Sequence, residues 1–310
     1  MKIGLPLVSI VCHTFNHEKY LEETINGFLN QKVDFPIEII IHDDASTDST
    51  RAIIEKYALE FPNLIHGVFQ DTNVYSKKIN IWANFTFPIA KGKYIAICEG
   101  DDYWNDEHKL QEQIHFLEQN ENFSICWTNY STKKGNTIAE SNLRIAEDYF
   151  KIDLNNIFDP YCTMSLTTVF RKDRLNLDQL NRLKHFKDNS LYLLLLKNGD
   201  GMFINKSTSV YRLHDEGVFS LKSVFFQQYS SYVNIQELYQ LDTAFQTQNI
   251  KKTLQNLLQN AAFEAVDVFF DDRSNFTKEM RVAVWKYFLQ SSVKLKIRFI
   301  KLIAKKIVQQ

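Results

Sequence analysis

The sequence is poor in residues that break or cross-link a chain. Its 310 residues include only nine glycines and five prolines, so we do not expect long disordered linkers. The four cysteines are Cys12, Cys98, Cys126 and Cys162. They stand far apart, and three of the four lie in apolar runs. This pattern indicates small buried side chains in a reducing compartment, not a disulfide framework or a zinc site.

A strong net charge and long apolar runs are also missing. The formal net charge is −1, so no global field favours nucleic acid as a partner. No stretch approaches the ~18 apolar residues of a membrane span. Gly4 and Pro6 interrupt the first apolar residues, which favours a lead-in to a strand over a signal peptide. We therefore expect a cytoplasmic globular protein of about two domains.

Apolar strands and amphipathic helices alternate over the first ~100 residues. Strands are expected at 7–12, 36–41, 64–69 and 94–98, and helices at 17–30, from the N-cap-rich residues 45–49 to about 60, and at 77–90. This order predicts a mostly parallel sheet with helices on both faces. The later pattern predicts helices at 106–120, 175–183 and 190–196, and strands at 123–130, 163–171 and 207–214. Residues 131–160 show no period and indicate an insertion or a mobile loop.

Polar clusters follow three of the predicted strands: His13–Asn16, Asp43–Asp44 and Glu99–Asp102. Ligands of parallel sheets bind at the carboxyl ends of the strands, where these clusters lie. Three carboxylates at the end of one buried strand repel one another and are costly to desolvate without a cation. A divalent metal with a polyanionic ligand is the economical explanation, and capping of the helix at 106–120 is the alternative.

Other phosphate-binding classes lack their motifs. No G-x-G-x-x-G or Walker-type loop is present, which argues against dinucleotide-binding and P-loop proteins. The segment His42–Ser46 lacks the second aspartate, two positions on, that an aspartyl phosphatase requires.

The motifs together resemble the family 2 glycosyltransferases of the GT-A fold. Residues 8–16 and 38–48 resemble the first two strands of that family, and residues 92–104 resemble its metal-binding DxD region. The closest resemblance is to a bacterial subgroup that reads E-G-D-D-Y-W, and Val210–His214 with Gly217 resembles its closing strand and loop. The resemblance covers about residues 5–220.

The resemblance implies a catalytic domain over residues 1–220. Its nucleotide-binding half spans about 1–104 and its acceptor half about 105–220. The implied enzyme is an inverting, metal-dependent hexosyl or N-acetylhexosaminyl transferase. It moves a sugar from a nucleotide diphosphate, UDP by family frequency, to an acceptor hydroxyl by single displacement. The expected setting is synthesis of a bacterial surface polysaccharide or its lipid-linked precursor, with a glycan or lipid-linked glycan as acceptor.

The resemblance also assigns residues to the site. The cofactor is Mg²⁺ or Mn²⁺, held by Asp101 first, then Asp102, with His214 as a further ligand. The nucleotide-sugar-binding residues are His13, Thr14, Asn16, Asp44, Asn84, Glu99, Asp101 and Arg212. Glu99 stands where the family has Asp, so we expect it near the ribose or a water molecule. Lys77, Lys78 and Asn84 stand where the family often has an Arg that contacts the diphosphate.

Direct displacement needs a general base that takes the acceptor's proton. The family places its base roughly 85 residues past the metal motif at the start of a helix, and Asp188 fits this position. Several residues keep a structural alternative. Asp188 can act as a helix cap, Asp43 can bind backbone amides, Arg212 and His214 can lie on an exposed edge strand, and Tyr103 and Trp104 can belong to the core.

Residues from about 221 to 310 form a predicted helical segment with a basic amphipathic tail. The tail has six cations and no acid from Lys294 onward. Four of the cations share one helical stripe, with isoleucines beside it: Lys294, Arg298, Lys301 and Lys305. Peripheral contact of residues 294–308 with the anionic inner face of the cell membrane is one interpretation. Docking on the protein itself, with a solvated basic face, is the other.

Two rival classes share parts of this pattern. A non-catalytic protein that binds a nucleotide sugar or a glycan could have the same fold, although Asp44, Asp101, Asp102 and Asp188 argue against a decayed site. A sugar nucleotidyltransferase has a related fold, but its glycine-rich opening loop with a lysine is absent here.

Overall fold

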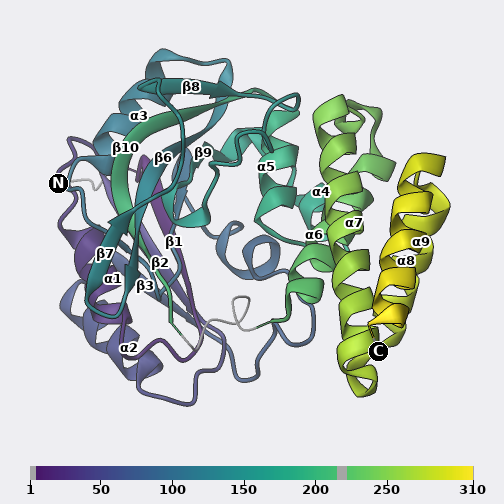
Figure 1. Cartoon of the computed structure of the whole chain (residues 1–310). Helices are drawn as coiled ribbons and strands as arrows, with labels where there is room; N and C mark the ends of the chain where they lie inside the picture. Colours follow the sequence, from purple (N-terminus) through teal and green to yellow (C-terminus); the bar gives the residue numbers. More distant parts are fainter. Residues whose placement is uncertain (1–4, 215–221, 310) are drawn as a thin grey trace. The chain divides into compact units, whose positions relative to one another are not determined.

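The computed structural model describes residues 5–214 and 222–309. The chain divides into two compact units, Met1–His214 and Asp215–Gln310 (Figure 1). The predicted boundary at residue 220 and the motif residue Gly217 lie outside the described residues. Across the two described ranges, no helix is both long and apolar enough to cross a membrane.

The first unit is built on a mixed, mostly parallel sheet whose order is β3-β2-β1-β4-β9-β6-β10-β5. Its parallel part consists of β3 (Ile65–Phe69), β2 (Ile37–Asp43), β1 (Val8–Thr14) and β4 (Tyr94–Ile97). β9 (Val169–Arg171) is antiparallel to both β4 and β6 (Phe123–Lys134), and β10 (Asp200–Arg212) runs parallel to β6. β5 (Tyr103–Trp104) pairs with β10 in the antiparallel sense. The predicted α/β class with a mostly parallel sheet is confirmed.

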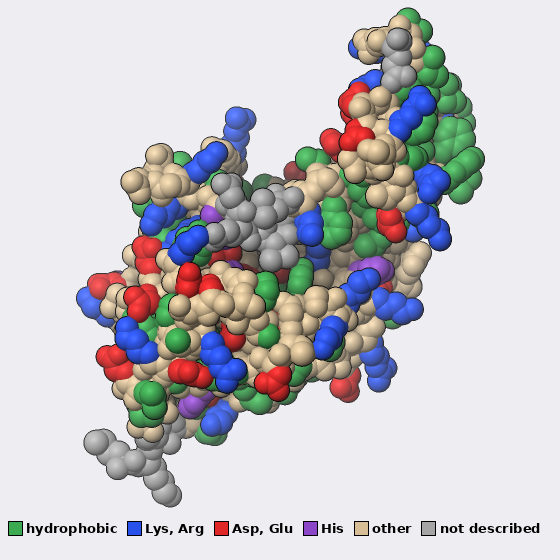
Figure 2. Space-filling model, turned by 90° about the horizontal axis from the view of Figure 1, so that it is seen from below, with side chains coloured by type: hydrophobic (Ala, Val, Ile, Leu, Met, Phe, Trp, Pro, Cys, Tyr) green, Lys and Arg blue, Asp and Glu red, His purple; other side chains and the backbone are tan. Residues whose placement is uncertain are grey.

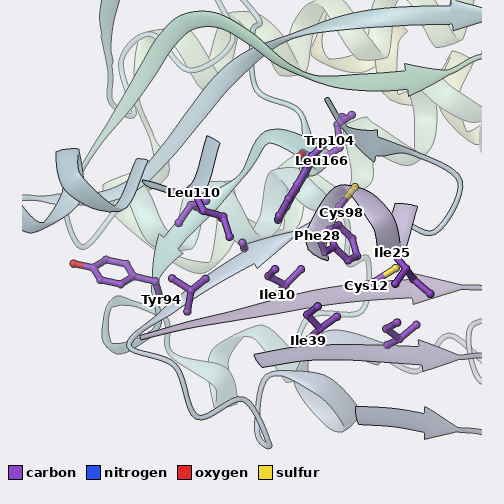
Figure 3. Close-up of a cluster of buried hydrophobic side chains, with 14 of the residues drawn as sticks. Ile10, Cys12, Ile25, Phe28, Ile39, Tyr94, Cys98, Trp104, Leu110 and Leu166 are labelled. Atoms are coloured by element: carbon purple, nitrogen blue, oxygen red, sulfur yellow. Dashed lines mark hydrogen bonds between the residues drawn. The ribbon is translucent and has the colours of Figure 1, made fainter. Parts of the chain in front are cut away.

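Alternate strand residues point to opposite faces of the sheet, so an apolar strand has apolar side chains on both faces, and helices cover both. On one face Ile10 and Cys12 share a buried core with α1 (Leu21–Leu29), α2 (Thr50–Glu60) and α3 (Lys109–Gln119) (Figure 3). On the other face Trp127 of β6 packs edge-on against Tyr192 of α5 (Asp188–Leu196), with ring centroids 5.2 Å apart. The short helix α4 (Leu177–Asn181) precedes α5. All four cysteines are buried and free.

Three sequence predictions were wrong. The strand expected at 163–171 begins only at Val169, after a 3₁₀ turn at Ser165–Thr167. Residues 131–160 are not one continuous loop, because β6 continues to Lys134, β7 (Thr137–Glu140) pairs with β6, and β8 (Tyr149–Ile152) pairs with β10. Their strand period was hidden because every residue of β7 is exposed, so neither face needs apolar side chains. In place of the helix expected at 77–90, the structure has only a short π-helical segment, η1 (Trp82–Thr86). Pro88 limits it, and the Asn80 side chain accepts a hydrogen bond from Ala83 N at 3.1 Å.

The second unit is helical, as expected. It consists of α6 (Val224–Leu241), α7 (Gln248–Asp271), α8 (Lys278–Gln290) and α9 (Val293–Val308). Ser or Thr side chains cap these helices at Ser223, Thr247, Thr277 and Ser292. Its core includes Ala261, Ala265 and Ala283, small residues that allow close approach of α7 and α8. Short 3₁₀ turns lie at Ser165–Thr167, Lys172–Arg174, Thr243–Phe245 and Arg273–Asn275.

Candidate active site

The three predicted polar clusters meet at one edge of the sheet, at the carboxyl ends of β1, β2 and β4. Backbone hydrogen bonds join them, since Gly100 N donates to His13 O at 2.9 Å and Asp44 N donates to Thr14 O at 3.0 Å. A glycine is required at position 100 because a Cβ atom there would lie 2.5 Å from Thr14 Cγ2. The loop Glu99–Asp102 after β4, which we call the acidic loop, therefore crosses directly over the end of β1.

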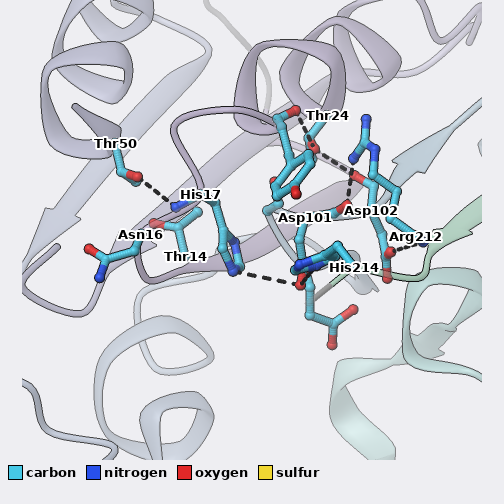
Figure 4. Close-up of polar contacts among 12 residues, drawn as sticks. Thr14, Asn16, His17, Thr24, Thr50, Asp101, Asp102, Arg212 and His214 are labelled. Carbon is cyan, nitrogen blue, oxygen red and sulfur yellow. Dashed lines mark hydrogen bonds and ion pairs between the residues drawn. The ribbon is translucent and has the colours of Figure 1, made fainter. Parts of the chain in front are cut away.

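Asp101 faces two histidines (Figure 4). Its Oδ2 atom lies 3.2 Å from His214 Nε2, after β10, and 3.6 Å from His17 Nε2, just before α1. Burial would raise the pKa of Asp101, but the hydrogen bond with His214 and the charge of His17 outweigh burial and lower it. Asp101 is therefore the ionised carboxylate of the cluster.

Asp102 lies next to Asp101 but has a different partner. Its Oδ1 atom accepts a hydrogen bond from Arg212 N at 2.8 Å, which ties the acidic loop to the end of β10. Burial, followed by the charges of Asp101 and Glu99, raises the pKa of Asp102 well above its usual range. The role of Asp102 as a metal ligand stays a prediction, and its observed contact is with the protein backbone.

Arg212 holds the acidic loop in place from the side. Its guanidinium donates to the backbone oxygen of Asp101 and to the carboxylate of Glu23. The guanidinium carbon also lies 4.5 Å from the ring centroid of Tyr103 and 5.2 Å from that of Tyr20. Arg212 is almost fully buried, so it is not a surface residue of an edge strand. It places a fixed positive charge directly behind Asp101.

Glu99 and Asp188 approach each other from β4 and α5. Ser165 Oγ donates to Glu99 Oε2 at 2.9 Å. Burial, then the charges of Asp188 and Asp101, raises the pKa of Glu99 to about 8. Asp188 is the first residue of α5, as predicted, and burial raises its pKa although Lys187 opposes the shift. The tertiary fold thus brings Asp188 within electrostatic reach of the acidic loop.

His13, Thr14 and Asp44 form a second part of the site with partners of their own. Trp82 Nε1 donates to His13 Nδ1 at 2.6 Å, and His13 Nε2 lies 3.1 Å from Thr86 Oγ1. Burial, followed by the charge of His42, lowers the pKa of His13 well below its usual value. Thr14 Oγ1 donates to the backbone of the neighbouring strand β2 at 3.0 Å. These contacts hold the side chains of His13 and Thr14 in place at the carboxyl ends of β1 and β2.

The carboxylate of Asp44 accepts two backbone hydrogen bonds, from Val74 N at 2.7 Å and from Tyr75 N at 3.0 Å. It therefore fastens the segment that follows β3. An ionised carboxylate offers about four lone-pair positions, so these two bonds leave acceptor capacity for a ligand.

The two predicted asparagines belong to other contacts. Asn16 Oδ1 accepts from Thr47 N at 2.8 Å and joins the turns after β1 and β2. Asn84 Nδ2 donates to Asn80 O at 2.7 Å and to Asn181 Oδ1 at 2.8 Å, which connects η1 to α4. None of these contacts involves a member of the acidic loop, so a ligand role for Asn16 or Asn84 stays a prediction.

Three residues of the site escaped sequence reasoning: His17, Glu23 and Ser165. His17 follows the polar break at His13–Asn16, and that position was a usable signal. Glu23 and Ser165 carry no local signal, because their roles depend on Arg212 and Glu99, which are far away in sequence. Tyr103 and Trp104, for which two roles were open, are buried, and Trp104 Nε1 donates to Leu166 O at 2.8 Å.

The cluster offers ligands for a divalent cation but not a complete shell. Among residues 5–214 and 222–309, no three His, Cys, Asp or Glu side chains form a ready-made metal site. Asp101 and His214 nevertheless place an anionic oxygen and an imidazole nitrogen 3.2 Å apart. Mg²⁺-type sites use only one or two carboxylates and complete their shell with phosphate and water. This pair therefore fits a metal that binds together with a diphosphate.

A mixed sheet with an acidic loop at the carboxyl ends of its parallel strands defines a protein of the GT-A type. Residues 9–175 match the family described as Glycosyl transferase family 2, which is more than half of the chain. The chain belongs to this family.

Three similar proteins illustrate the range of relatives. Over 212 residues the chain is 31% identical to the UDP-Glc:alpha-D-GlcNAc-diphosphoundecaprenol beta-1,3-glucosyltransferase WfaP of Escherichia coli, covering 68% of this chain and 78% of WfaP. It is 42% identical over 122 residues to an uncharacterized protein of Mycobacterium tuberculosis, and this match spans 39% of the chain and only 34% of the relative. The crystal structure of Staphylococcus aureus TarS 1–349 with UDP-GlcNAc superposes with a TM-score of 0.59 at 20% identity. The superposition covers 97% of this chain and 80% of TarS 1–349, and it shows that the two chains share a fold.

Proposed function

We propose that this protein is an inverting glycosyltransferase that moves a sugar from a nucleotide diphosphate, UDP in our proposal, to an acceptor hydroxyl by single displacement. The observation that carries the proposal is the position of Glu99 at the carboxyl edge of the sheet, where it senses the charges of both Asp188 and Asp101, and Asp101 Oδ2 lies 3.2 Å from His214 Nε2. Asp188 can accept a proton at this edge, while Asp101 and His214 can bind a charged leaving group through a divalent cation. Membership of glycosyl transferase family 2 supports the same reaction class.

Donor binding is assigned to the two parts of the site. Asp101 and His214, with Asp102 as the further predicted ligand, would hold Mg²⁺ or Mn²⁺, which neutralises the charge on the leaving diphosphate when bound. Arg212 adds a fixed cation behind the acidic loop. His13, Thr14, Asn16 and Asp44 are proposed to face the nucleoside, and Asn84 is proposed to face the diphosphate. In this arrangement Glu99, fastened by Ser165, contacts the ribose or a bound water.

Asp188 is the proposed general base. Its carboxylate must be ionised to accept the proton of the acceptor hydroxyl as that oxygen attacks the anomeric carbon. Burial raises its pKa, which makes the carboxylate a stronger proton acceptor than an exposed aspartate. Attack from the side opposite the diphosphate inverts the anomeric configuration, so an α-linked donor would yield a β-linked product.

We further propose a hexosyl or N-acetylhexosaminyl donor and a glycan or lipid-linked glycan acceptor. WfaP, whose name specifies a diphosphoundecaprenol-linked acceptor, supports a role in synthesis of a bacterial surface polysaccharide or its precursor. We also propose that the protein belongs to the E-G-D-D-Y-W subgroup, that its catalytic domain spans residues 1–220, and that it is cytoplasmic. We propose that residues 294–308 contact the inner face of the cell membrane.

Thermal shift and transfer assays on three proteins test this function. The wild-type protein should gain thermal stability with a UDP-sugar and Mn²⁺, because a ligand of the native state must stabilise it. Asp101→Asn should lose this gain, whereas Asp188→Asn should keep it and lose transfer. The exposed Asp173 supplies the control, Asp173→Asn, which should behave like the wild type.

Two results would oppose the proposal in different ways. If no nucleotide diphosphate stabilises the wild type with metal present, the donor site is wrong. If UDP-sugars stabilise it but neither lipid-linked nor soluble glycans are ever glycosylated, the alternative of a non-catalytic binding protein is favoured.

A further inference from the structure

Helix α9 presents three different faces. With about 100° between successive residues, its exposed apolar side chains fall within one sector. This apolar stripe consists of Val293, Ile297, Ile300, Ala304, Ile307 and Val308. A second exposed sector beside it, the cationic stripe, consists of Lys294, Arg298, Lys301 and Lys305. Ile300 and Ile307 are 52% and 60% exposed, which is unusual for large apolar side chains gathered on one face.

The third face attaches α9 to its own unit and sets the orientation of the other two. Phe299 is buried, with its ring centroid 5.0 Å from that of Tyr287 on α8 and 5.8 Å from that of Phe263 on α7. Lys306 Nζ forms an ion pair with Asp267 of α7 at 2.7 Å. Docking on the protein itself therefore accounts for only one of the three faces. The apolar stripe cannot turn inward without breaking these contacts.

The preceding helix, α8, carries exposed apolar side chains of its own. Trp285 and Leu289 of α8, four residues apart and therefore on one face, are 64% and 70% exposed. Figure 2 shows hydrophobic side chains gathered along the edge of the helical unit, with Lys and Arg side chains next to them. Exposed tryptophan is typical of the boundary between lipid headgroups and acyl chains.

The cationic stripe differs from the docked face in its ion pairs. Among the described residues, no carboxylate lies within ion-pairing distance of its four side chains, whereas Lys306 on the docked face has two such partners. Residues 293–309 contain no Asp or Glu. An isologous pairing of two copies through α9 would bring like charges together without an acid to balance them. The charge pattern thus favours an anionic partner over a second copy.

We propose that the apolar stripe and cationic stripe of α9, together with Trp285 and Leu289, form a surface that lies on anionic lipid bilayers. The apolar side chains enter the boundary between headgroups and acyl chains, and the cations stay at the level of the lipid phosphates. This inference deepens the membrane contact of the proposed function by naming the inserted side chains. It does not depend on sugar transfer.

Cosedimentation of the full chain with vesicles tests the surface. Vesicles of phosphatidylcholine with phosphatidylglycerol should bind the wild-type protein, binding should weaken as salt rises, and pure phosphatidylcholine should bind it far less. Lys301→Gln with Lys305→Gln should weaken binding about 25-fold, from ~1 kcal/mol or about 5-fold per cation. Lys251→Gln with Lys252→Gln removes two exposed lysines from α7 of the same unit and should change binding little.

The apolar part has its own test. Ile297→Ser with Ile300→Ser should weaken vesicle binding at least tenfold at constant charge, and a matched thermal melt should show that both variants fold. Equal binding to both vesicle types, or equal weakening by the α7 control pair, would overturn the proposal. A concentration-dependent dimer that the Ile→Ser pair abolishes, without vesicle binding, would assign the surface to a second copy instead. Transfer to a soluble acceptor should persist in all these variants, so failure of transfer alone opposes only the proposed function.

Discussion

Arg212→Ala should lower both the stability of the protein and its ability to bind a donor. The guanidinium donates to Asp101 O, and a hydrogen bond from a charged group contributes about 1.5–3 kcal/mol. Contacts with the Tyr20 and Tyr103 rings add roughly 0.5–1 kcal/mol each. The ion pair with Glu23 adds little, about 0–1 kcal/mol, because Glu23 is half exposed. These contributions add up to about 2.5–6 kcal/mol. Because contributions of one side chain are not additive, we expect a loss near the lower end, about 3 kcal/mol, in the free energy of unfolding.

Thermal unfolding followed by circular dichroism measures this loss. For a unit of this size, about 3 kcal/mol corresponds to a decrease of roughly 6–12 °C in Tm. Arg212→Lys should recover only part of it, because an ammonium group cannot reproduce the planar fork that joins Asp101 O and Glu23. Arg51→Ala is a suitable control, since Arg51 is exposed and pairs with Glu55 at 3.0 Å within one helix.

A second mutation tests the geometry itself. Glu23→Gln should cost less than 1 kcal/mol alone and should add almost nothing to Arg212→Ala, because both changes remove the same contact. If Arg212→Ala leaves Tm within about 1 °C of the wild type and raises only the donor KM, our account is wrong. Arg212 would then be a phosphate ligand that does not support the acidic loop.

Three further predictions concern the base, the metal and a buried lysine. Asp188→Asn should lower kcat by roughly 10²–10⁴-fold with little change in donor affinity. The raised pKa of Asp188 should place the acid limb of the wild-type kcat profile above the ordinary aspartate value of about 3.9, with activity rising as pH rises; a limb that survives in the variant would exclude this base. Chelation by EDTA should abolish transfer and Mn²⁺ or Mg²⁺ should restore it, whereas His214→Ala should require more metal; full activity in EDTA would contradict the metal site. Burial lowers the pKa of Lys109 to about 7, so between about pH 7 and 10 the unfolded chain binds more protons at this side chain than the native state does, and the contribution of Lys109 to the stability of the native state should rise across this window. Lys109→Met should remove this contribution, which amounts to ~5 kcal/mol at most. Urea titrations of both proteins at several pH values measure it, and an equal dependence of unfolding free energy on pH in the two proteins would contradict the prediction.

Local patterns were sufficient for much of the fold. The continuous apolar runs that end at Cys12, Ile41 and Cys98 predicted the strands β1, β2 and β4, because a strand buried on both faces must be apolar throughout. The start of α5 at Asp188 was also predictable from sequence. The exposed strand β7 was not, since exposure on both faces removes the period on which such predictions depend.

The sequence by itself determined the family, the order of the elements and the presence of three acids after β4, because hydrophobic periods and motifs are local properties of a chain. Only the tertiary structure decided how those acids differ. Asp101 faces His17 and His214, Asp102 accepts from Arg212 N, and Glu99 accepts from Ser165. Their partners come from distant segments, and the pKa of a carboxyl group depends on its burial and on the charges that the fold places nearby. The same holds for α9, whose apolar stripe is exposed because its unit covers only the face that carries Phe299.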